Sequence, residues 1–336
     1  MRLSQYQSRE IHLTSRPEGI PTSDNFSIEE REVTSPEKGE VLVRNIYMSV
    51  DPAMRPPLTN GQQPLGKVMS AQAIGQVIES AHEGFQEGDY VQSRKGFREY
   101  FKSNGDGLQK VITEDEPLSV HLHVLGGTGL TAWGGLLITG QLKENESVFV
   151  SAAAGSVGSL VGQIAKIKQC RVVGSCGSDE KVEWLTRELG FDYAFNYKTT
   201  KISRELHKGA PDGIDVYFEN VGGAHLDAAL GQMRPLGRIP VCGMISSYNN
   251  KGARSEGVTT LSNMIYNRVT MKGFVMYEFF PRREEFLRDM RSWMREGKLK
   301  YAETFMDGIQ EAPAALIGLF TGANKGKMMV RLAEES

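Results

Sequence analysis

Three glycines lie in a run of small and apolar residues, where a ligand or a neighbouring element could approach the backbone closely. Residues 150–163 read VSAAAGSVGSLVGQ, with Gly155, Gly158 and Gly162. An apolar strand, ESVFVSA, precedes this turn and an amphipathic helix follows it. At such a junction, unpaired N–H groups and the helix dipole attract a phosphate. The pattern A-x-x-G-x-x-G predicts a nucleotide-binding turn, although close packing of helix on sheet would also explain the glycines.

The end of the next strand, RVVGSC, bears on which nucleotide would bind. Folds that prefer NAD usually have an Asp or Glu there, about 20 residues beyond the glycine turn, bonded to the adenosine ribose. This chain has Cys176 at that position, followed by Gly177 and Ser178. No carboxylate would repel a 2′-phosphate, and Lys181 is close enough in sequence to reach one. The sequence therefore favours NADPH over NADH, unless Lys181 is only a solvated surface lysine.

The cysteines and histidines predict no metal site. The three cysteines, Cys170, Cys176 and Cys242, form no C-x-x-C pair, which argues against a disulfide framework and a four-cysteine zinc site. We expect them to pack as small apolar side chains. His121 and His123 are two residues apart, and a polar loop explains them better than a metal pair does.

Length and composition indicate a two-domain globular protein. The chain has 336 residues, of which 40% are hydrophobic and 24% charged, with a net charge of −2. No basic stripe predicts nucleic-acid binding, and no polybasic tail or long apolar segment predicts a membrane partner. The first 30 residues contain no apolar run typical of a signal peptide. We therefore expect a cytoplasmic protein.

The pattern of predicted elements changes near residue 125. Before it, segments 40–50, 71–79 and 86–92 read as short strands of a mainly antiparallel, barrel-like unit. The prolines of DPAMRPPLTNG predict that no helix forms there. After it, apolar strands alternate with amphipathic helices, which predicts an α/β fold with a doubly wound parallel sheet. Residues 311–332 read as a helix, a turn and a strand that could return to the N-terminal unit. We predict a dinucleotide-binding domain at 123–299 and a discontinuous domain at 1–122 and 300–336.

Longer motifs give a more specific indication. The segments AAAGSVGSLVGQIAKIKQCRVVGSCGSDEK, GIDVYFENVGG, GRIPVCGMISSYN and GANKGK resemble the zinc-free medium-chain dehydrogenase/reductases. Within that family they resemble the NADPH-dependent enone reductases, which include prostaglandin reductases and bacterial curcumin reductases. The resemblance covers nearly the whole chain. It implies a GroES-like catalytic domain beside the Rossmann domain, and a homodimer joined through the edge strand of the Rossmann sheet, within MKGFVMYEF.

The resemblance also implies which residues bind NADPH. The pyrophosphate would lie on the turn formed by Ala154, Gly155, Ser156, Val157 and Gly158. Lys181 and Tyr197 would hold the 2′-phosphate, and Asn220 and Asn324 would contact the cofactor. The ribose and nicotinamide would be enclosed by Cys242, Gly243, Met244, Ile245, Ser246, Ser247 and Tyr248. Backbone groups of Phe274, Val275 and Met276, in a strand MKGFVM, would bind the carboxamide. Without the resemblance, Tyr197 reads as a strand-edge aromatic residue, and Asn220 and Asn324 read as turn residues.

The implied reaction reduces the carbon–carbon double bond of a conjugated carbonyl compound. Where metal-dependent relatives have zinc ligands, MSAQAIGQVIES has neither Cys nor His, so hydrogen bonds would have to polarise the carbonyl. Hydride addition to the β-carbon leaves an enolate, which needs hydrogen-bond donors. We expect these to be the Tyr248 phenol and a ribose hydroxyl of the cofactor. Tyr248 or water would protonate the α-carbon, and packing or a lid role would also explain Tyr248.

The predicted substrate pocket departs from the family pattern. Ala53 and Trp133 occupy positions where Tyr is usual, and Gly127 replaces a usual Met; Thr131 completes the predicted pocket. The segment NNKGARSEGVTTL lacks the usual prolines and is predicted to form a mobile lid. We expect a bulky, apolar, conjugated carbonyl substrate. Two alternatives stay open, a quinone or carbonyl reductase on the same fold and a non-catalytic NADPH-binding sensor or scaffold.

Overall fold

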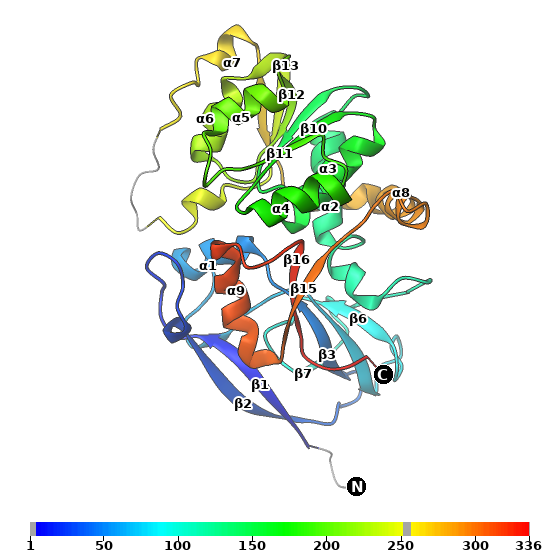
Figure 1. Ribbon diagram of the computed structural model, residues 1–336. Coiled ribbons are helices and arrows are strands. Elements are labelled where there is room, and N and C mark those ends of the chain that lie inside the picture. Colours follow the sequence, from blue (N-terminus) through cyan, green and yellow to red (C-terminus); the bar gives the residue numbers. More distant parts are fainter. Residues whose placement is uncertain (1–4, 251–256, 336) are drawn as a thin grey trace. The chain divides into compact units, whose positions relative to one another are not determined.

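The computed structural model describes residues 5–250 and 257–335 (Figure 1). The chain divides into two compact units, one formed by Met1–Leu122 with Glu303–Ser336 and the other by His123–Ala302. Much of the predicted lid, residues 251–256, lies outside the described residues.

The second unit is built on a parallel sheet in the order β11-β10-β9-β12-β13-β14. Its strands are β9 (Ser147–Val150), β10 (Arg171–Cys176), β11 (Tyr193–Asn196), β12 (Ile214–Phe218), β13 (Met233–Val241) and β14 (Thr270–Gly273). The chain runs outward from β9 to β11 and then returns to the other side of β9 with β12. Strands β9 and β12 therefore flank the switch point of a doubly wound sheet. This arrangement confirms the predicted Rossmann sheet.

Helices connect these strands and lie on both faces of the sheet (Figure 1). They are α2 (Gly127–Gly134), α3 (Ser156–Ile167), α4 (Asp179–Glu183), α5 (Ile202–Gly209), α6 (Gly223–Leu230), α7 (Asn263–Tyr266) and α8 (Arg283–Arg295). The apolar spacing of α3 places Leu160, Val161 and Ile164 on its buried face. A Cβ added to Gly162 would come within 2.0 Å of Cζ of Phe191. Helix α3 can pack this closely only because residue 162 has no side chain.

The edge strand β14 is shorter than the sequence predicts. MKGFVM was expected to form one strand, but β14 ends at Gly273, which pairs with Val241, the last residue of β13. Because β13 ends there, the ladder cannot continue. Phe274 turns into the core with its ring 6.0 Å from that of Phe218, and Met276 begins a 3-10 helix.

The first unit consists mainly of antiparallel strands. One sheet has the order β2-β1-β4, and the larger one has the order β15-β16-β3-β5-β6-β8, with β7 paired to β3. The strands are β1 (Gln5–Leu13), β2 (Phe26–Thr34), β3 (Val41–Ser49), β4 (Lys67–Val68), β5 (Ala73–Ser80), β6 (Tyr90–Ser93), β7 (Tyr100–Ser103), β8 (Gln109–Lys110), β15 (Glu303–Asp307) and β16 (Lys327–Arg331). Helices α1 (Arg55–Asn60) and α9 (Ala312–Thr321) accompany them. Strand β16 pairs antiparallel with β3 and parallel with β15, so the C-terminal segment belongs to this unit.

The prediction that prolines exclude a helix from DPAMRPPLTNG is wrong. A 3-10 turn, Pro52–Met54, leads into α1, where Pro56 and Pro57 occupy the first turn. First-turn N–H groups have no intrahelical acceptor, so proline is tolerated there. The buried Arg55 guanidinium donates to the carbonyl of Gly19 at 2.6 Å and so fixes the segment that carries Ala53.

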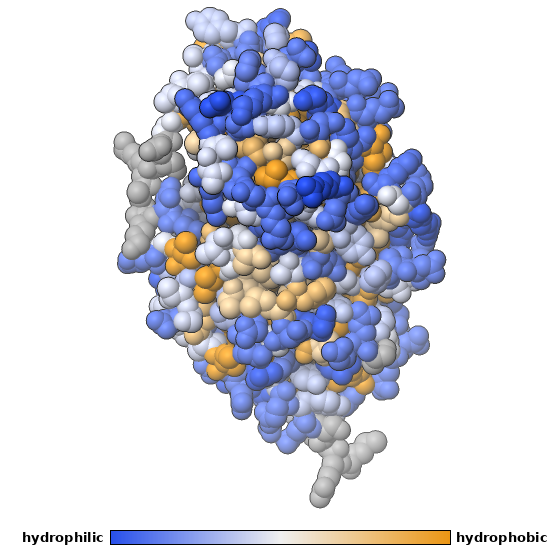
Figure 2. Space-filling view, viewed as in Figure 1, coloured by the Kyte–Doolittle hydropathy of each residue, from blue (hydrophilic) through white to orange (hydrophobic). Residues whose placement is uncertain are grey.

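Surface hydropathy agrees with a globular protein. In the face shown in Figure 2, apolar residues form separated groups among hydrophilic ones. Within residues 5–250 and 257–335, no helix has both the length and the apolar character required to cross a bilayer.

Candidate nucleotide-binding site

The predicted glycine turn connects β9 to α3 at the carboxyl end of the parallel sheet. Ala152 lies in the left-handed region with φ 50°, and the Gly155 N–H donates to its carbonyl at 3.0 Å. A Cβ added to Gly158 would come within 2.5 Å of the same carbonyl oxygen, so this helix start requires glycine. The first-turn N–H groups of α3, including those of Ser156 and Val157, have no intrahelical acceptor. This turn, which also contains the buried Ala154, suits a pyrophosphate.

Asn220 joins the glycine turn to the loop at 242–248. Its side-chain amide donates to the carbonyl of Ser151 at 2.7 Å, and its backbone N–H donates to Ser151 Oγ at 3.0 Å. Its own carbonyl accepts from the N–H of Ile245 at 3.1 Å. One residue further on, the carbonyl of Val221 accepts from both the N–H and the hydroxyl of Ser246. The structure thus brings three predicted cofactor-binding segments together within the second unit.

Glu219, which the sequence analysis did not single out, is completely buried beside these turns. Its Oε1 accepts from the Tyr217 hydroxyl at 2.7 Å and from the N–H groups of Val221 and Gly222 at 2.6 and 2.9 Å. Burial raises the pKa of Glu219 above its ordinary value, and these hydrogen bonds only partly oppose the shift. An acid directly after the mainly apolar strand IDVYF, at the carboxyl end of the sheet, was the sequence signal that could have identified it.

Two lysines and a phenol gather at the end of β10. A Cβ added to Gly177 would lie 3.2 Å from Cε of Lys198, and 3.5 Å from both its Nζ and the Tyr197 hydroxyl. Desolvation lowers the pKa of Lys181, and the positive charge of Lys198 lowers it further. Cys176 ends β10 and brings no carboxylate. Lys198 beside a residue without a side chain, with Lys181 within electrostatic reach of it, fits a phosphate dianion. Lys198 was not predicted, although it directly follows Tyr197 in FNYK.

Tyr248 folds back on its own loop. A 3-10 turn, Ile245–Ser247, places its phenol oxygen where it accepts from the N–H of Met244 at 3.3 Å. A Cβ added to Gly243 would lie 3.1 Å from this oxygen. Desolvation raises the pKa of Tyr248 above its usual value, so the phenol stays protonated at neutral pH. Because its oxygen is already an acceptor, its own hydrogen is available for a different partner.

The predicted pocket residues of the second unit differ in their surroundings. Thr131 Oγ1 donates to the carbonyl of Gly127 at 2.7 Å along α2, and both residues are partly exposed. Trp133 is only 1% exposed, and its Nε1 donates to Oδ2 of Asp289 at 3.0 Å. The guanidinium of Arg282 lies 5.2 Å from the indole ring. Core packing of this unit therefore accounts for Trp133, and it forms no open pocket wall within the unit.

Two predicted residues belong to the first unit. Ala53 is exposed in the Pro52–Met54 turn. Asn324 lies between α9 and β16, where its side-chain amide donates to the carbonyl of Gly326 at 2.7 Å. This contact explains Asn324 as a turn residue, and its contact with the cofactor stays a prediction.

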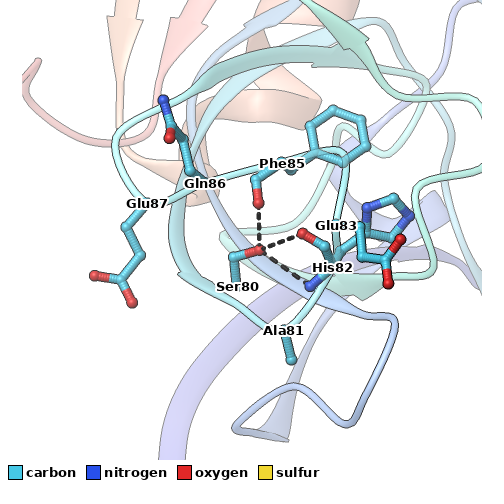
Figure 3. Close-up of a pocket in the computed structure, with 7 residues that line it drawn as sticks. All are labelled: Ser80, Ala81, His82, Glu83, Phe85, Gln86 and Glu87. Carbon is cyan, nitrogen blue, oxygen red and sulfur yellow. Dashed lines mark hydrogen bonds between the residues drawn. The ribbon is translucent and has the colours of Figure 1, made fainter.

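Figure 3 shows a pocket in the turn between β5 and β6 of the first unit. It is lined by Ser80, Ala81, His82, Glu83, Phe85, Gln86 and Glu87. The Ser80 hydroxyl donates to the carbonyl of Phe85 at 2.6 Å and accepts from the N–H of His82 at 3.2 Å. These bonds serve the turn itself, and none of the predicted site residues lines this pocket.

The thiols of the buried Cys176 and the partly exposed Cys242 have raised pKa values. Burial raises the pKa of Cys176 to about 11. Desolvation, followed by the Glu219 carboxylate, raises the pKa of Cys242 to about 12. Thiols in this state are poor nucleophiles. Across the part of the chain that the structure describes, no group of three or more His, Cys, Asp or Glu residues could hold a metal ion.

Known oxidoreductases are similar in sequence to both units of this chain. Two family profiles match, one described as the N-terminal domain of oxidoreductase at residues 9–111 and one as zinc-binding dehydrogenase at residues 156–294. The chain is 40% identical to the NADPH-dependent curcumin reductase of Escherichia coli over 336 residues, covering 97% of each chain. It is 43% identical to prostaglandin reductase 1 of Bos taurus over 318 residues, covering 93% of this chain and 95% of the other.

A solved structure extends the similarity to three dimensions. CurA from Vibrio vulnificus in complex with NADPH matches with a TM-score of 0.91 at 38% identity, covering 97% of this chain and 100% of that chain. Sequence and fold thus agree over almost the whole length. The chain belongs to the medium-chain dehydrogenase/reductase family, in the zinc-free branch that contains the curcumin and prostaglandin reductases.

Proposed function

We propose that this protein uses NADPH to reduce the carbon–carbon double bond of α,β-unsaturated ketones and aldehydes. The observation that carries the proposal is the position of the Tyr248 phenol, whose oxygen accepts from the N–H of Met244 in a loop that is bonded to the turn of Asn220. The relatives named as curcumin reductase and prostaglandin reductase support the reaction class.

The cofactor would be held mainly by the second unit. The turn at Gly155–Gly158 would bind the pyrophosphate, and Lys181, Tyr197 and Lys198 the 2′-phosphate. Asn220 and residues 242–248 would surround the nicotinamide ribose. Backbone groups of residues 274–276 would bind the carboxamide, and the contact of Asn324 with the cofactor stays a prediction.

The reaction follows from the chemistry of a conjugated carbonyl. When bound, NADPH supplies a hydride to the β-carbon of the substrate. Negative charge then develops on the carbonyl oxygen as an enolate. The Tyr248 O–H donates a hydrogen bond to that oxygen and stabilises the charge. A proton from Tyr248 or from water then reaches the α-carbon, which leaves a saturated carbonyl compound.

Ala53, Gly127 and Thr131 remain the predicted pocket residues. Each has a small side chain or none, which would suit a bulky apolar substrate. Trp133 would act on this pocket only by fixing α2 against α8.

Product analysis tests the proposal. The protein is incubated with NADPH and either a simple enone or a quinone, and the products are identified. A saturated ketone with its carbonyl intact would support the proposal. Alcohol or quinol as the only product would reject it and favour a carbonyl or quinone reductase. NADPH binding without turnover of any enone in a broad panel would favour a sensor or scaffold.

We also propose a homodimer joined through β14. This strand lies at the end of the sheet order and pairs with β13. The strand and the segment after it expose apolar side chains, namely Met271, Val275, Tyr277 and Phe280. An uncovered apolar edge promotes aggregation, whereas pairing with a second copy would cover it.

A further inference from the structure

Glu219 is a buried acid for which the proposed reaction has no use. It follows β12 directly and is 0% exposed. Besides Tyr217, Val221 and Gly222, its Oε1 is bonded to the Ser151 hydroxyl at 3.1 Å. Its other oxygen, Oε2, is buried and has no hydrogen-bond partner among the described residues. Burying a carboxyl group in this way is unfavourable, so its hydrogen bonds must serve a role that offsets the cost.

The backbone of Glu219 bonds to a further segment. Its carbonyl accepts from the N–H groups of Cys242 and Gly243 at 2.9 and 3.1 Å, and its own N–H donates to the carbonyl of Pro240 at 3.0 Å. Side chain and backbone together therefore contact the glycine turn, the turn after β12 and the loop at 242–248. These segments meet at the switch point, where doubly wound sheets bind dinucleotides.

We propose that Glu219 is a positioning residue that holds these three segments in the geometry required for NADPH binding. Its Oε1 draws the N–H groups of Val221 and Gly222 inward, and this fixes the turn that begins at Asn220. Ser151, which bonds to the same oxygen, also accepts from the Asn220 N–H at 3.0 Å. The proposal rests on the proposed NADPH binding and is independent of the proposed enone reaction.

Asp215 is a matched control on the same strand. Its Oδ2 accepts from the Ser147 N–H at 2.8 Å and from Arg234 Nη1 at 3.1 Å. It therefore ties the start of β12 to the start of β9, at the amino end of the sheet. Its removal should lower stability without reaching the segments that would bind the cofactor.

The test compares Glu219→Ala, Glu219→Gln and Asp215→Ala in the full chain. The readouts are the NADPH dissociation constant from calorimetry, the melting temperature and amide hydrogen exchange. We expect Glu219→Ala to weaken NADPH binding about tenfold or more, because several buried donors lose their acceptor. Exchange should quicken most at residues 221 and 222, whose N–H groups lose the side-chain acceptor, and less at residues 242 and 243, which bond to the backbone carbonyl of Glu219. Glu219→Gln keeps an acceptor oxygen and should bind within about threefold of wild type, and Asp215→Ala within about twofold despite a lower melting temperature.

A shorter acid provides a second variant if Glu219→Ala fails to fold. Glu219→Asp withdraws the carboxylate by one methylene and should also weaken NADPH binding. Wild-type affinity in a folded Glu219→Ala or Glu219→Asp protein would overturn the proposal. Equal weakening by Asp215→Ala would also overturn it, as would a wild-type protein that does not bind NADPH. Because the readout is binding, failure of the enone reaction alone would leave the result intact.

Discussion

A phenol can stabilise an enolate only while it keeps its own proton. Tyr248 meets this condition because desolvation raises its pKa, and the N–H of Met244 occupies an acceptor position on its oxygen. Loss of the hydroxyl would remove the donor while leaving the loop that is bonded to Asn220 in place.

We expect Tyr248→Phe to slow enone reduction about a hundredfold, the usual contribution of a positioned proton donor. The NADPH dissociation constant should stay within about threefold of wild type, since the change removes one weak hydrogen bond. Single-turnover kinetics and calorimetry measure the two quantities. An unchanged reduction rate would exclude the phenol from the reaction.

The cluster at Gly177 makes a separate residue-scale prediction about cofactor choice. Lys181→Ala and Lys198→Ala should each weaken NADPH binding by about 10-fold to 150-fold and affect NADH binding little, because a charge-assisted hydrogen bond contributes about 1.5–3 kcal/mol when formed. Calorimetry with both cofactors at two salt concentrations measures the effect. Lys208→Ala, which removes an ion pair with Glu205 on α5, is the control. Equal losses for NADPH and NADH would refute the assignment.

At the scale of elements, the contact between α3 and Phe191 decides how the nucleotide-binding helix packs. The Phe191 ring occupies the space that a side chain on residue 162 would need. Gly162 is therefore required for the close packing of α3 against Phe191, whereas Gly158 is required for the turn before α3.

Gly162→Ala should destabilise the protein by about 2 kcal/mol, because inserting atoms into a packed core usually costs about 1–3 kcal/mol. Denaturant unfolding measures this change. Gly231→Ala, at the end of α6, is the control, since its added Cβ would meet only an ordinary contact at 3.4 Å. Combining Gly162→Ala with Phe191→Leu should recover part of the loss, and a fully additive double mutant would contradict direct contact.

Helix α6 carries a buried histidine that makes stability depend on pH. Burial lowers the pKa of His225 to about 4, and its ring packs edge-on against Tyr197 at 5.0 Å. In the unfolded chain, its pKa is about 6.5. Since the unfolded state binds the proton more readily, the contribution of neutral His225 is complete above about pH 6.5 and is lost as the pH falls towards 4.

For pH 5, these pKa values predict that the His225 contribution is about 2 kcal/mol smaller than at pH 7.5. His225→Leu should remove the contribution of His225 to the pH dependence of stability and leave the contributions of other titratable groups unchanged. Free energies of unfolding of both proteins at the two pH values measure the difference. If wild type and His225→Leu lost the same free energy of unfolding between pH 7.5 and pH 5, His225 would not titrate in this pH range.

At the scale of the whole molecule, the edge strand β14 is predicted to determine the oligomeric state. Met271→Lys places a charge on the exposed edge and should convert the dimer to monomer, because a buried unpaired charge is strongly unfavourable. Sedimentation velocity measures the state. Leu65→Lys, at an exposed apolar residue of the first unit, should leave it unchanged. A wild-type monomer, or a Met271→Lys dimer, would contradict the proposed interface.

Much of the second unit was predictable because its signals are local. Alternating strands and helices predicted the doubly wound sheet, which the strand order confirms. The glycine spacing predicted the turn before α3, and the absence of an acid at Cys176 followed from the end of one strand. The resemblance added the family, which the comparisons show.

Other features depended on contacts between distant residues. Strand β14 ends where its neighbour β13 ends. The sequence MKGFVM by itself does not show that the strand stops at Gly273. The helix α1 tolerates its prolines because they lie in its first turn. The resemblance predicts Trp133 as a pocket residue, and the sequence gives no sign that its indole bonds to Asp289 and packs against Phe286 of α8.

The sequence alone therefore determined the order of elements, the nucleotide-binding turn and the absence of a carboxylate beside the predicted 2′-phosphate. These are properties of residues within one turn or one strand of each other. The tertiary structure decided that Lys198 lies beside Gly177 and that Glu219 joins Ser151 to the turn after β12. Such contacts form only when the packed sheet brings together residues that are far apart in the chain, and they leave no periodic pattern in the sequence.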